Sequence, residues 1–148
     1  MLSSKSDVER LKEINLNIVS EYPAVQEINK TIRQLLSDDS VETHVCNAVE
    51  ICLTEALNNI IKHAYSGNND KVIDVTLKKD TNYLEFELRD EGIPREKLVI
   101  NDLSFDPNDI EGLPESGMGL FIIKQLMDEI NYYSLNGKNY FTLKKWLY

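Results

Sequence analysis

The 148-residue sequence contains no apolar run that approaches the roughly 20 residues needed to cross a bilayer as a helix. Its N-terminus, MLSSKSDVERLKEI, also lacks the apolar core of a secretory signal. These two absences predict a cytoplasmic protein without direct membrane contact. Hydrophobic residues make up 42% of the chain and charged residues 28%, which is typical of a globular protein.

Cysteine is scarce, since only Cys46 and Cys52 are present, six residues apart in a segment with helical patterning. On a helix that spacing is a rise of about 9 Å, which is too long for a disulfide. With only two histidines, His44 and His63, a structural zinc site also lacks ligands. We therefore expect both cysteines to be core residues.

Basic residues are outnumbered, with 16 Lys and Arg against 25 Asp and Glu and a formal net charge of −9. Proteins that bind nucleic acid usually carry a basic surface, so direct nucleic-acid binding is not expected. An acidic surface suits solubility and would also suit a basic protein partner. Solubility is the simpler of these two interpretations.

The pattern of apolar residues predicts an α+β fold, a two-layer sandwich with helices on one face of a mostly antiparallel sheet. Strands are expected at 11–19, 72–77, 83–88, 131–135 and 140–147, and helices at 23–37, 41–65 and 119–130. Asp38, Asp39 and Ser40 are N-cap candidates for the second helix. Residues 95–116 are irregular, and a loop of this length is most often functional. No repeat or linker is visible, so a single domain over residues 1–148 is expected.

A polar stripe runs along the expected helix in the segment TEALNNIIKHAY (54–65). Glu55, Asn59, Lys62 and His63 lie at i, i+4, i+7 and i+8, which stacks them along one side of a helix. An Asn carbonyl suits Mg²⁺, and a carboxylate one turn away can deprotonate a hydroxyl. Lys62 or His63 could meet a phosphate. The alternative is a solvated face, and from the stripe alone the two interpretations are evenly matched.

The predicted strand 83–88 runs out into Asp90-Glu91-Gly92. An Asp at a strand's end holds its carboxylate on a rigid element, and the following glycine lets a ligand approach the backbone closely. Such a carboxylate can accept a hydrogen bond from an exocyclic amine like that of adenine. Asp and Gly also dominate ordinary turns, and this segment taken alone favours the turn.

Two glycines, Gly117 and Gly119, directly precede the third expected helix in SGMGLFIIKQLMDEI (116–130). Glycines there leave backbone N–H groups accessible at a helix N-terminus, where the helix dipole also favours phosphate. A lone G-x-G before a helix is a weak signal, and a plain glycine-rich loop is the alternative.

The order of these three segments resembles the ATP-binding fold shared by gyrase, histidine kinases and related ATPases (the Bergerat fold, or GHKL superfamily). TEALNNIIKHAY matches its N box, RDEGIP its first glycine box and SGMGLFII its second. Within the superfamily the sequence is most similar to the bacterial anti-sigma-factor serine/threonine-protein kinases of stress and sporulation switches. The form of the N box and the ending GMGLFIIKQLMDEI carry that similarity, which covers roughly residues 10–147.

The resemblance implies ATP and Mg²⁺ as cofactors and assigns roles residue by residue. Glu55 matches the catalytic base, Asn59 the Mg²⁺ ligand and Asp90 the adenine-binding aspartate. Residues 95–116 correspond to the ATP lid, and Arg33 aligns with an arginine near the family's partner surface. The other nucleotide-binding residues implied by the matching are Lys62, His63, Gly92, Ser116, Gly117, Met118, Gly119 and Leu120.

The sequence departs from the family pattern in two places. The first glycine box usually reads D-x-G-x-G, but Pro94 stands where its second glycine would, and proline can stiffen the start of the lid. The lid region also has no basic residue between Lys97 and Lys124. It carries five acidic residues, Asp102, Asp106, Asp109, Glu111 and Glu115. Phosphate charge would then be balanced by Mg²⁺, backbone amides and the Lys62 region.

The leading hypothesis is an ATP- and Mg²⁺-dependent serine/threonine protein kinase that phosphorylates a STAS-domain antagonist and, as an anti-sigma factor, sequesters a sigma factor. The alternative is a nucleotide-gated anti-sigma binding module without kinase activity. The catalytic half of a histidine kinase is a weaker third candidate, because no phosphoacceptor helix pair is seen. Family members commonly act as dimers, so the resemblance also implies a homodimer.

Overall fold

Five strands form one antiparallel sheet in the order β1-β2-β3-β5-β4. The computed structural model describes residues 12–95 and 115–147, except for the side chains of residues 115–118. The strands are β1 (Lys12–Val19), β2 (Val72–Lys79), β3 (Tyr83–Asp90), β4 (Glu129–Leu135) and β5 (Lys138–Trp146). All five predicted strands are therefore present, and β2 and β3 each extend two residues further than predicted.

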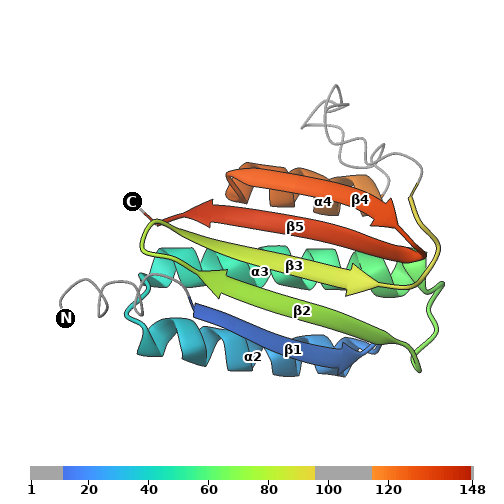
Figure 1. Ribbon diagram of the computed structural model, residues 1–148, viewed down its shortest axis with the longest axis horizontal. Coiled ribbons are helices and arrows are strands. Elements are labelled where there is room, and N and C mark those ends of the chain that lie inside the picture. The colour runs from blue at the N-terminus through green and yellow to red at the C-terminus, as the bar shows by residue number, and fades with distance from the viewer. Residues whose placement is uncertain (1–11, 96–114, 148) are drawn as a thin grey trace.

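The α-helices of the described residues cover one face of this sheet (Figure 1). They are α2 (Tyr22–Asp38), α3 (Thr43–Asn59) and α4 (Glu115–Leu126). Helix α3 lies behind the central strands and contacts both of the other helices. The predicted α+β class, with helices on one face of an antiparallel sheet, is confirmed. None of the helices in the described ranges has both the length and the apolarity that crossing a bilayer requires.

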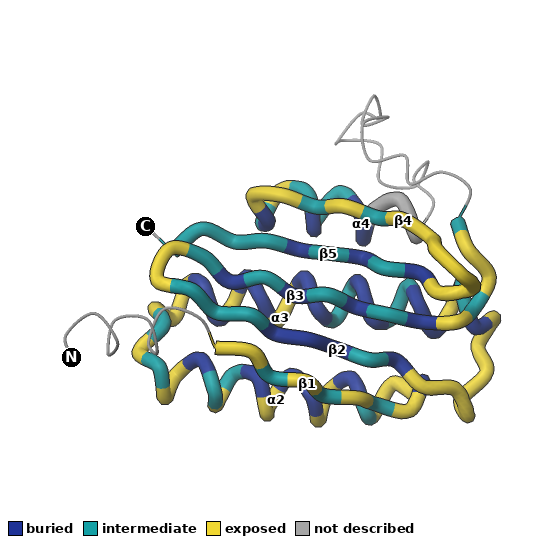
Figure 2. The backbone as a smooth tube through the Cα atoms, viewed as in Figure 1, coloured by how far each residue is buried: buried dark blue, intermediate teal, exposed yellow. Residues whose placement is uncertain are grey.

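The core lies between α3 and the central strands, where the buried residues gather (Figure 2). Alternate β3 residues, Leu84, Phe86 and Leu88, are buried beneath the helices, as period-two patterning requires. Cys46 and Cys52 lie in the same core as free cysteines, which confirms the prediction made for them. Burial raises the pKa of the Cys52 thiol to about 12.

The predicted N-cap of the second helix is wrong. Helix α3 begins at Thr43, and Glu42 is its N-cap residue. The three candidates belong to the end of α2 instead, because Asp38 is the last residue of α2 and the Asp39 N–H donates to carbonyls of its last turn. Ser40 then takes a left-handed conformation, with φ of 61°, that turns the chain into α3.

The helix predicted to reach residue 65 is continuous, but its last turn is wider than an α-helical turn. Residues Ile60–Ala64 form a π-helix, η1, and the Tyr65 N–H donates to the Ile60 carbonyl at 3.0 Å. Short π segments are rare and occur frequently at functional sites. This turn holds the second half of the predicted polar stripe.

Helix α4 occupies 115–126 and not the predicted 119–130. Its end is set by Asp128, whose N–H donates to the Lys144 carbonyl at 2.8 Å and whose carboxylate accepts the Trp146 N–H at 2.7 Å. These bonds to β5 stop the helix and place residues 129 and 130 in β4. The apolar positions at 126–130 therefore cross a boundary between helix and strand. Most of the predicted lid, residues 96–114, lies outside the described residues.

Candidate functional site

The carboxylate of Asp90 is held in place at the end of β3, where it is only 4% exposed. Asn139 faces it across the β3–β5 ladder and is 2% exposed. The Asn139 Nδ2 donates to Asp90 Oδ1 at 2.7 Å, and the Gly92 N–H donates to the same oxygen at 2.9 Å. Among the described residues no donor reaches Asp90 Oδ2. One carboxylate oxygen is thus fixed by the fold and the other is available to a ligand.

Burial raises the pKa of Asp90 above its ordinary value of 3.8, and the hydrogen bonds from Asn139 and Gly92 offset part of that rise. The ionised carboxylate therefore lies in a poorly solvated position. A ligand that donates a hydrogen bond to Oδ2 would relieve some of this desolvation.

Asp90 lines a small cavity of about 30 Å³ enclosed by α3, η1, α4 and the inner face of β4 and β5. The remaining lining residues are Ala56, Asn59, Ile60, His63, Ala64, Ile93, Arg95, Leu120, Tyr132 and Phe141. A volume of this size holds about one or two water molecules. A ring-shaped ligand therefore enters only when side chains at the mouth move, and Ile93, at 64% exposed, lies at the surface where such movement meets little resistance.

Glu55 and Asn59 meet the α4 backbone at Gly119. A Cβ placed on Gly119 would lie 2.8 Å from Glu55 Oε2 and 3.5 Å from Asn59 Nδ2. The glycine therefore leaves room for the Glu55 carboxylate between the two helices. The Asn59 Nδ2 is buried and has no hydrogen-bond partner among the described residues. A rotation of this amide would present its oxygen at the same place.

The second half of the polar stripe divides at the π turn. His63 lines the cavity with Asn59, whereas Lys62 is exposed and does not line it. The stripe therefore presents its members to two different environments. The structure brings Asn59, His63 and Asp90 together and leaves Lys62 at the surface.

The second glycine box forms the first part of α4 and does not precede the helix. Ser116, Gly117 and Met118 lie inside the helix that begins at Glu115, which corrects the expected helix start at Gly119. Leu120, the last residue of this box in the predicted site, is 6% exposed and lines the cavity beside Asp90. The second glycine box therefore reaches the cavity through Leu120.

Gly92 is required by a close contact with the end of η1. A Cβ on Gly92 would collide with the backbone oxygen of Ala64, and the Ile93 N–H donates to that same oxygen at 2.8 Å. In the structure, the close approach at this glycine is therefore made by the helix end. Sequence reasoning had assigned that approach to a ligand.

Sequence reasoning missed several residues that build the site. Asn139 lies between the strands predicted at 131–135 and 140–147, and its role depends on a strand register that no local pattern reveals. The Tyr65 hydroxyl accepts the Glu91 N–H at 2.9 Å and donates to the Val72 carbonyl at 2.7 Å, which ties the helix end to two strands. Its position at the end of the N box was the available signal. Arg95 is the other omission, and no sequence signal distinguished it from the rest of the lid.

Arg33 is placed away from the cavity, on the surface shared by α2 and α3. Its Nη1 donates to Glu50 Oε1 at 3.1 Å and its Nη2 to Asn47 Oδ1 at 2.7 Å. The side chain is 37% exposed, so these bonds tie the two helices together at the surface.

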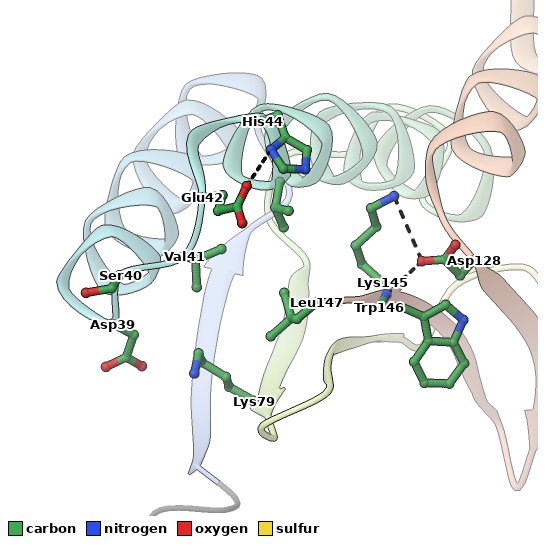
Figure 3. A pocket seen from close by; sticks show the side chains of 11 residues that line it. Asp39, Ser40, Val41, Glu42, His44, Lys79, Asp128, Lys145, Trp146 and Leu147 are labelled. Carbon is green, nitrogen blue, oxygen red and sulfur yellow. Dashed lines mark hydrogen bonds and ion pairs between the residues drawn. The ribbon is translucent and has the colours of Figure 1, made fainter.

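A second and much larger cavity, of about 460 Å³, lies at the opposite end of the sheet (Figure 3). It is lined by residues of the α2–α3 connection, the start of α3 and the ends of β2 and β5. Its charged groups largely satisfy one another, with Lys145 Nζ 3.9 Å from Asp128 Oδ2 and His44 Nδ1 3.2 Å from Glu42 Oε2. None of the nucleotide-site residues predicted from the sequence lines it.

Residues 18–145 match the family model described as the histidine kinase-like ATPase domain. Curated relatives include the serine-protein kinase RsbW of Staphylococcus aureus, which is 28% identical over 129 residues that span 84% of this chain and 80% of the relative. RsbW of Bacillus cereus is also 28% identical, over 83% of this chain and 78% of the relative. These matches confirm the resemblance found in the three sequence boxes.

Two solved structures share the fold. The RsbU and RsbW domains of a Mycobacterium tuberculosis protein superpose with a TM-score of 0.63 at 12% identity, over 90% of this chain and 31% of that one. The SiaB–SiaC complex from Pseudomonas aeruginosa superposes with a TM-score of 0.60 at 14% identity, over 98% and 95% of the two chains. At these identities the likeness supports the fold alone.

Proposed function

Because the chain belongs to the histidine kinase-like ATPase family, we propose that it binds ATP with Mg²⁺ and phosphorylates a serine or threonine of a partner protein. The partner implied by the resemblance is a STAS-domain antagonist, and the kinase also sequesters a sigma factor as an anti-sigma factor. The name serine-protein kinase, carried by the curated relatives, supports transfer to a protein hydroxyl. The observation that carries the proposal is the buried Asp90, with one oxygen engaged and the other available at the cavity.

Recognition of the base rests on Asp90. Adenine offers an exocyclic amine, which donates to Asp90 Oδ2, while apolar side chains such as Leu120 and Phe141 contact the flat ring. Asn139 keeps the carboxylate oriented, because its amide donates both to Asp90 Oδ1 and, at 3.0 Å, to the Gly92 carbonyl. The rigid support reduces the ordering cost of binding.

The residues near Asn59 fit a Mg²⁺ ion bound together with phosphates. Among the described residues no group of three His, Cys, Asp or Glu side chains could hold a metal. Mg²⁺ needs few protein oxygens when phosphates and waters complete its shell. The buried Asn59 Nδ2 has no partner in the described part of the chain, so a rotation of this amide would offer its oxygen as one neutral ligand. When bound, the ion neutralises phosphate charge.

Glu55 is the proposed catalytic base. Its carboxylate lies one helical turn before Asn59 and next to Gly119, where the missing Cβ leaves room for it in its present position. The partner's Oγ forms a bond to the γ-phosphorus as the bond to the β–γ bridging oxygen breaks. The hydroxyl proton passes to Glu55, and ADP is the leaving group. Catalysis of this kind depends mainly on positioning and charge neutralisation.

The proposal is tested by incubating the protein with γ-labelled ATP, Mg²⁺ and a STAS-domain partner. We expect label on a serine or threonine of the partner. Glu55→Gln should reduce the transfer rate by about 100-fold or more, while nucleotide affinity changes little. Glu129→Gln is the control, because this carboxylate is exposed on β4 and lines neither cavity. Nucleotide binding without any labelled partner would remove the kinase function.

A nucleotide-gated anti-sigma module without phosphoryl transfer is the second candidate. The charge of the lid favours it, because five acidic residues and no basic residue lie between Lys97 and Lys124. Under this function, Glu55→Gln leaves partner exchange intact, and ATP occupancy alone decides which partner is bound. Glu55→Gln therefore separates the two candidates: the variant loses phosphoryl transfer under the first function and keeps partner exchange under the second.

The assembly is proposed from the resemblance. We propose a single ATP-binding domain that forms a homodimer, with the exposed edge of β1 and the surface of α2 as candidate contacts. Light scattering of the purified protein gives the mass directly, and a monomer at micromolar concentration would remove the dimer.

A further inference from the structure

The segment of residues 91–95, called here the strap, is fixed to the fold along its whole length. Each residue that has a backbone N–H donates it to a specific acceptor. The acceptors are Tyr65 Oη for Glu91 at 2.9 Å, Asp90 Oδ1 for Gly92 at 2.9 Å, Ala64 O for Ile93 at 2.8 Å and Tyr132 Oη for Arg95 at 2.9 Å. Pro94 has no N–H and fixes its own φ. The strap is therefore a rigid support. A glycine at position 94, where the family pattern has one, would have allowed its backbone to move.

The strap places Arg95 beside the cavity. Its side chain lines the cavity and is partly buried, and burial lowers the pKa of its guanidinium below its ordinary value. Among the described residues, no carboxylate forms an ion pair with this guanidinium. Arginine remains charged in such surroundings. A half-buried cation without a carboxylate partner gains from any electron-rich surface that enters the cavity.

The other residues of the cavity indicate which part of a nucleotide lies next to Arg95. Asp90 is an acceptor for a base amine, and Leu120, Tyr132 and Phe141 offer apolar or aromatic surface. Such a lining suits a flat heteroaromatic ring better than a phosphate chain. A guanidinium is planar and weakly hydrated, so it stacks well on aromatic rings.

We infer that Arg95 stacks its guanidinium on the purine ring of the nucleotide, as a further base-binding residue that the strap holds in position. The inference rests on the proposed nucleotide binding and extends it to a residue outside the three sequence boxes. Because the backbone of Arg95 is fixed and its side chain has several rotatable bonds, the guanidinium can move aside by one ring thickness and cover the base. Pro94 and Tyr132 are positioning residues that act through Arg95.

The test compares the affinities of adenosine, ADP and ATP for the wild type and Arg95→Ala by calorimetry. A stacking contact to the base predicts a loss of about five- to tenfold that is equal for the three ligands and insensitive to salt. Arg89→Ala is the matched control. Arg89 precedes Asp90 on β3 and points to the opposite face of the sheet, where it bonds to Thr76 and Glu87.

The possible results separate this inference from the proposed function. A loss that grows with the number of phosphates and weakens in high salt would assign Arg95 to the phosphates and overturn the stacking contact. An unchanged affinity in Arg95→Ala would also overturn it, while leaving nucleotide binding in place. If the wild type binds none of the three ligands, the proposed function and this inference fall together.

The positioning role of Tyr132 is tested with Tyr132→Phe. This change removes the hydroxyl that accepts the Arg95 N–H and keeps the ring, whose centroid lies 6.2 Å from that of Phe141. We expect about a threefold loss of adenosine affinity in the wild-type background and none in the Arg95→Ala background. Tyr133→Phe, on the opposite face of β4, is the control. An equal loss in both backgrounds would show that Tyr132 does not act through Arg95.

Discussion

The two ends of the sheet differ in the kind of space they enclose. The cavity near Trp146 has a volume of about 460 Å³. At the other end the cavity that Asp90 lines has only about 30 Å³, and it lies next to an open hollow of about 650 Å³ between the end of η1, the start of β2 and residues 91–93. The cavity near Trp146 is bordered by polar contacts at the surface, including one between His44 and Glu42, whose side chains are 74% and 75% exposed. The cavity that Asp90 lines contains a buried carboxylate with a buried amide beside it.

This comparison shows that buried polar chemistry is a better guide to a binding site than volume. Exposed ion pairs contribute little and rearrange easily, so the large cavity carries little information about a ligand. A carboxylate that is 4% exposed is costly unless it has partners, and within the described part of the chain only one of its oxygens has them. If the two ends of the sheet are independent, a substitution at the Trp146 end should leave ligand binding at the Asp90 end unchanged.

The largest effect is expected from Asp90→Asn. The amide oxygen can still accept from Asn139 and Gly92, but an NH₂ group then replaces the available oxygen and faces the amine of the base. We expect ATP affinity to fall by about 10- to 100-fold while the protein stays folded. Titration with a fluorescent ATP analogue measures the affinity, and circular dichroism checks the fold. Wild-type affinity in this variant would remove Asp90 from the base site.

The same variant has a predictable pH dependence. Because the pKa of Asp90 is raised in the folded state, its ionised form is disfavoured there relative to the unfolded chain. The wild type should therefore be less stable than Asp90→Asn at neutral pH, and the difference should shrink as the pH falls through the raised pKa towards 3.8. Urea unfolding of both proteins across this range gives the difference. A difference in unfolding free energy that grows as the pH falls would contradict this prediction.

The next effect concerns glycines at the Asp90 end. Gly92→Ala should destabilise the fold by about 2–3 kcal/mol, because its Cβ would collide with the Ala64 backbone and force the strap away from the helix end. Gly67→Ala is the comparison, since Gly67 has a φ of 80° but open space around it. That change should cost only about 1 kcal/mol. Equal free energies of unfolding for the two variants would argue against a steric role for Gly92.

The smallest effect is expected at the opposite end of the sheet. Asp128→Ala removes the acceptor of the Trp146 N–H and should lower the free energy of unfolding by about 1 kcal/mol. ATP affinity should not change, because the residue is separated from the cavity by the length of the sheet. A loss of affinity comparable with that of Asp90→Asn would show that the two ends are coupled.

Most of the fold could be predicted from local patterns. Period-two alternation predicted the strands, and the three boxes predicted which segments approach the site. The errors occurred where a distant segment determines the local structure. Asp128 ends α4 because it bonds to β5, and nothing in the apolar periodicity of residues 119–130 reveals that bond.

The predicted site was incomplete for the same physical reason. Asn139 lies 49 residues from Asp90 in sequence, so only the pairing of β3 with β5 identifies it as the support of the carboxylate. Lys62 and His63 are adjacent residues of the π turn at Ile60–Ala64 and likewise face different environments, although the predicted stripe placed them together. A hydropathy pattern also does not show that the hydroxyls of Tyr65 and Tyr132 accept N–H groups of the strap.

The pairing of Asp90 with Asn139 also has a consequence for synthesis of the chain. Strand β5 follows every other described element in sequence, so a ribosome makes all three sequence boxes before it makes the amide that supports Asp90. A nascent chain that stops before residue 139 therefore has the binding helix and the carboxylate but no support between them. Under the proposed function, nucleotide capture should begin only when the final hairpin has been made and has paired with β3.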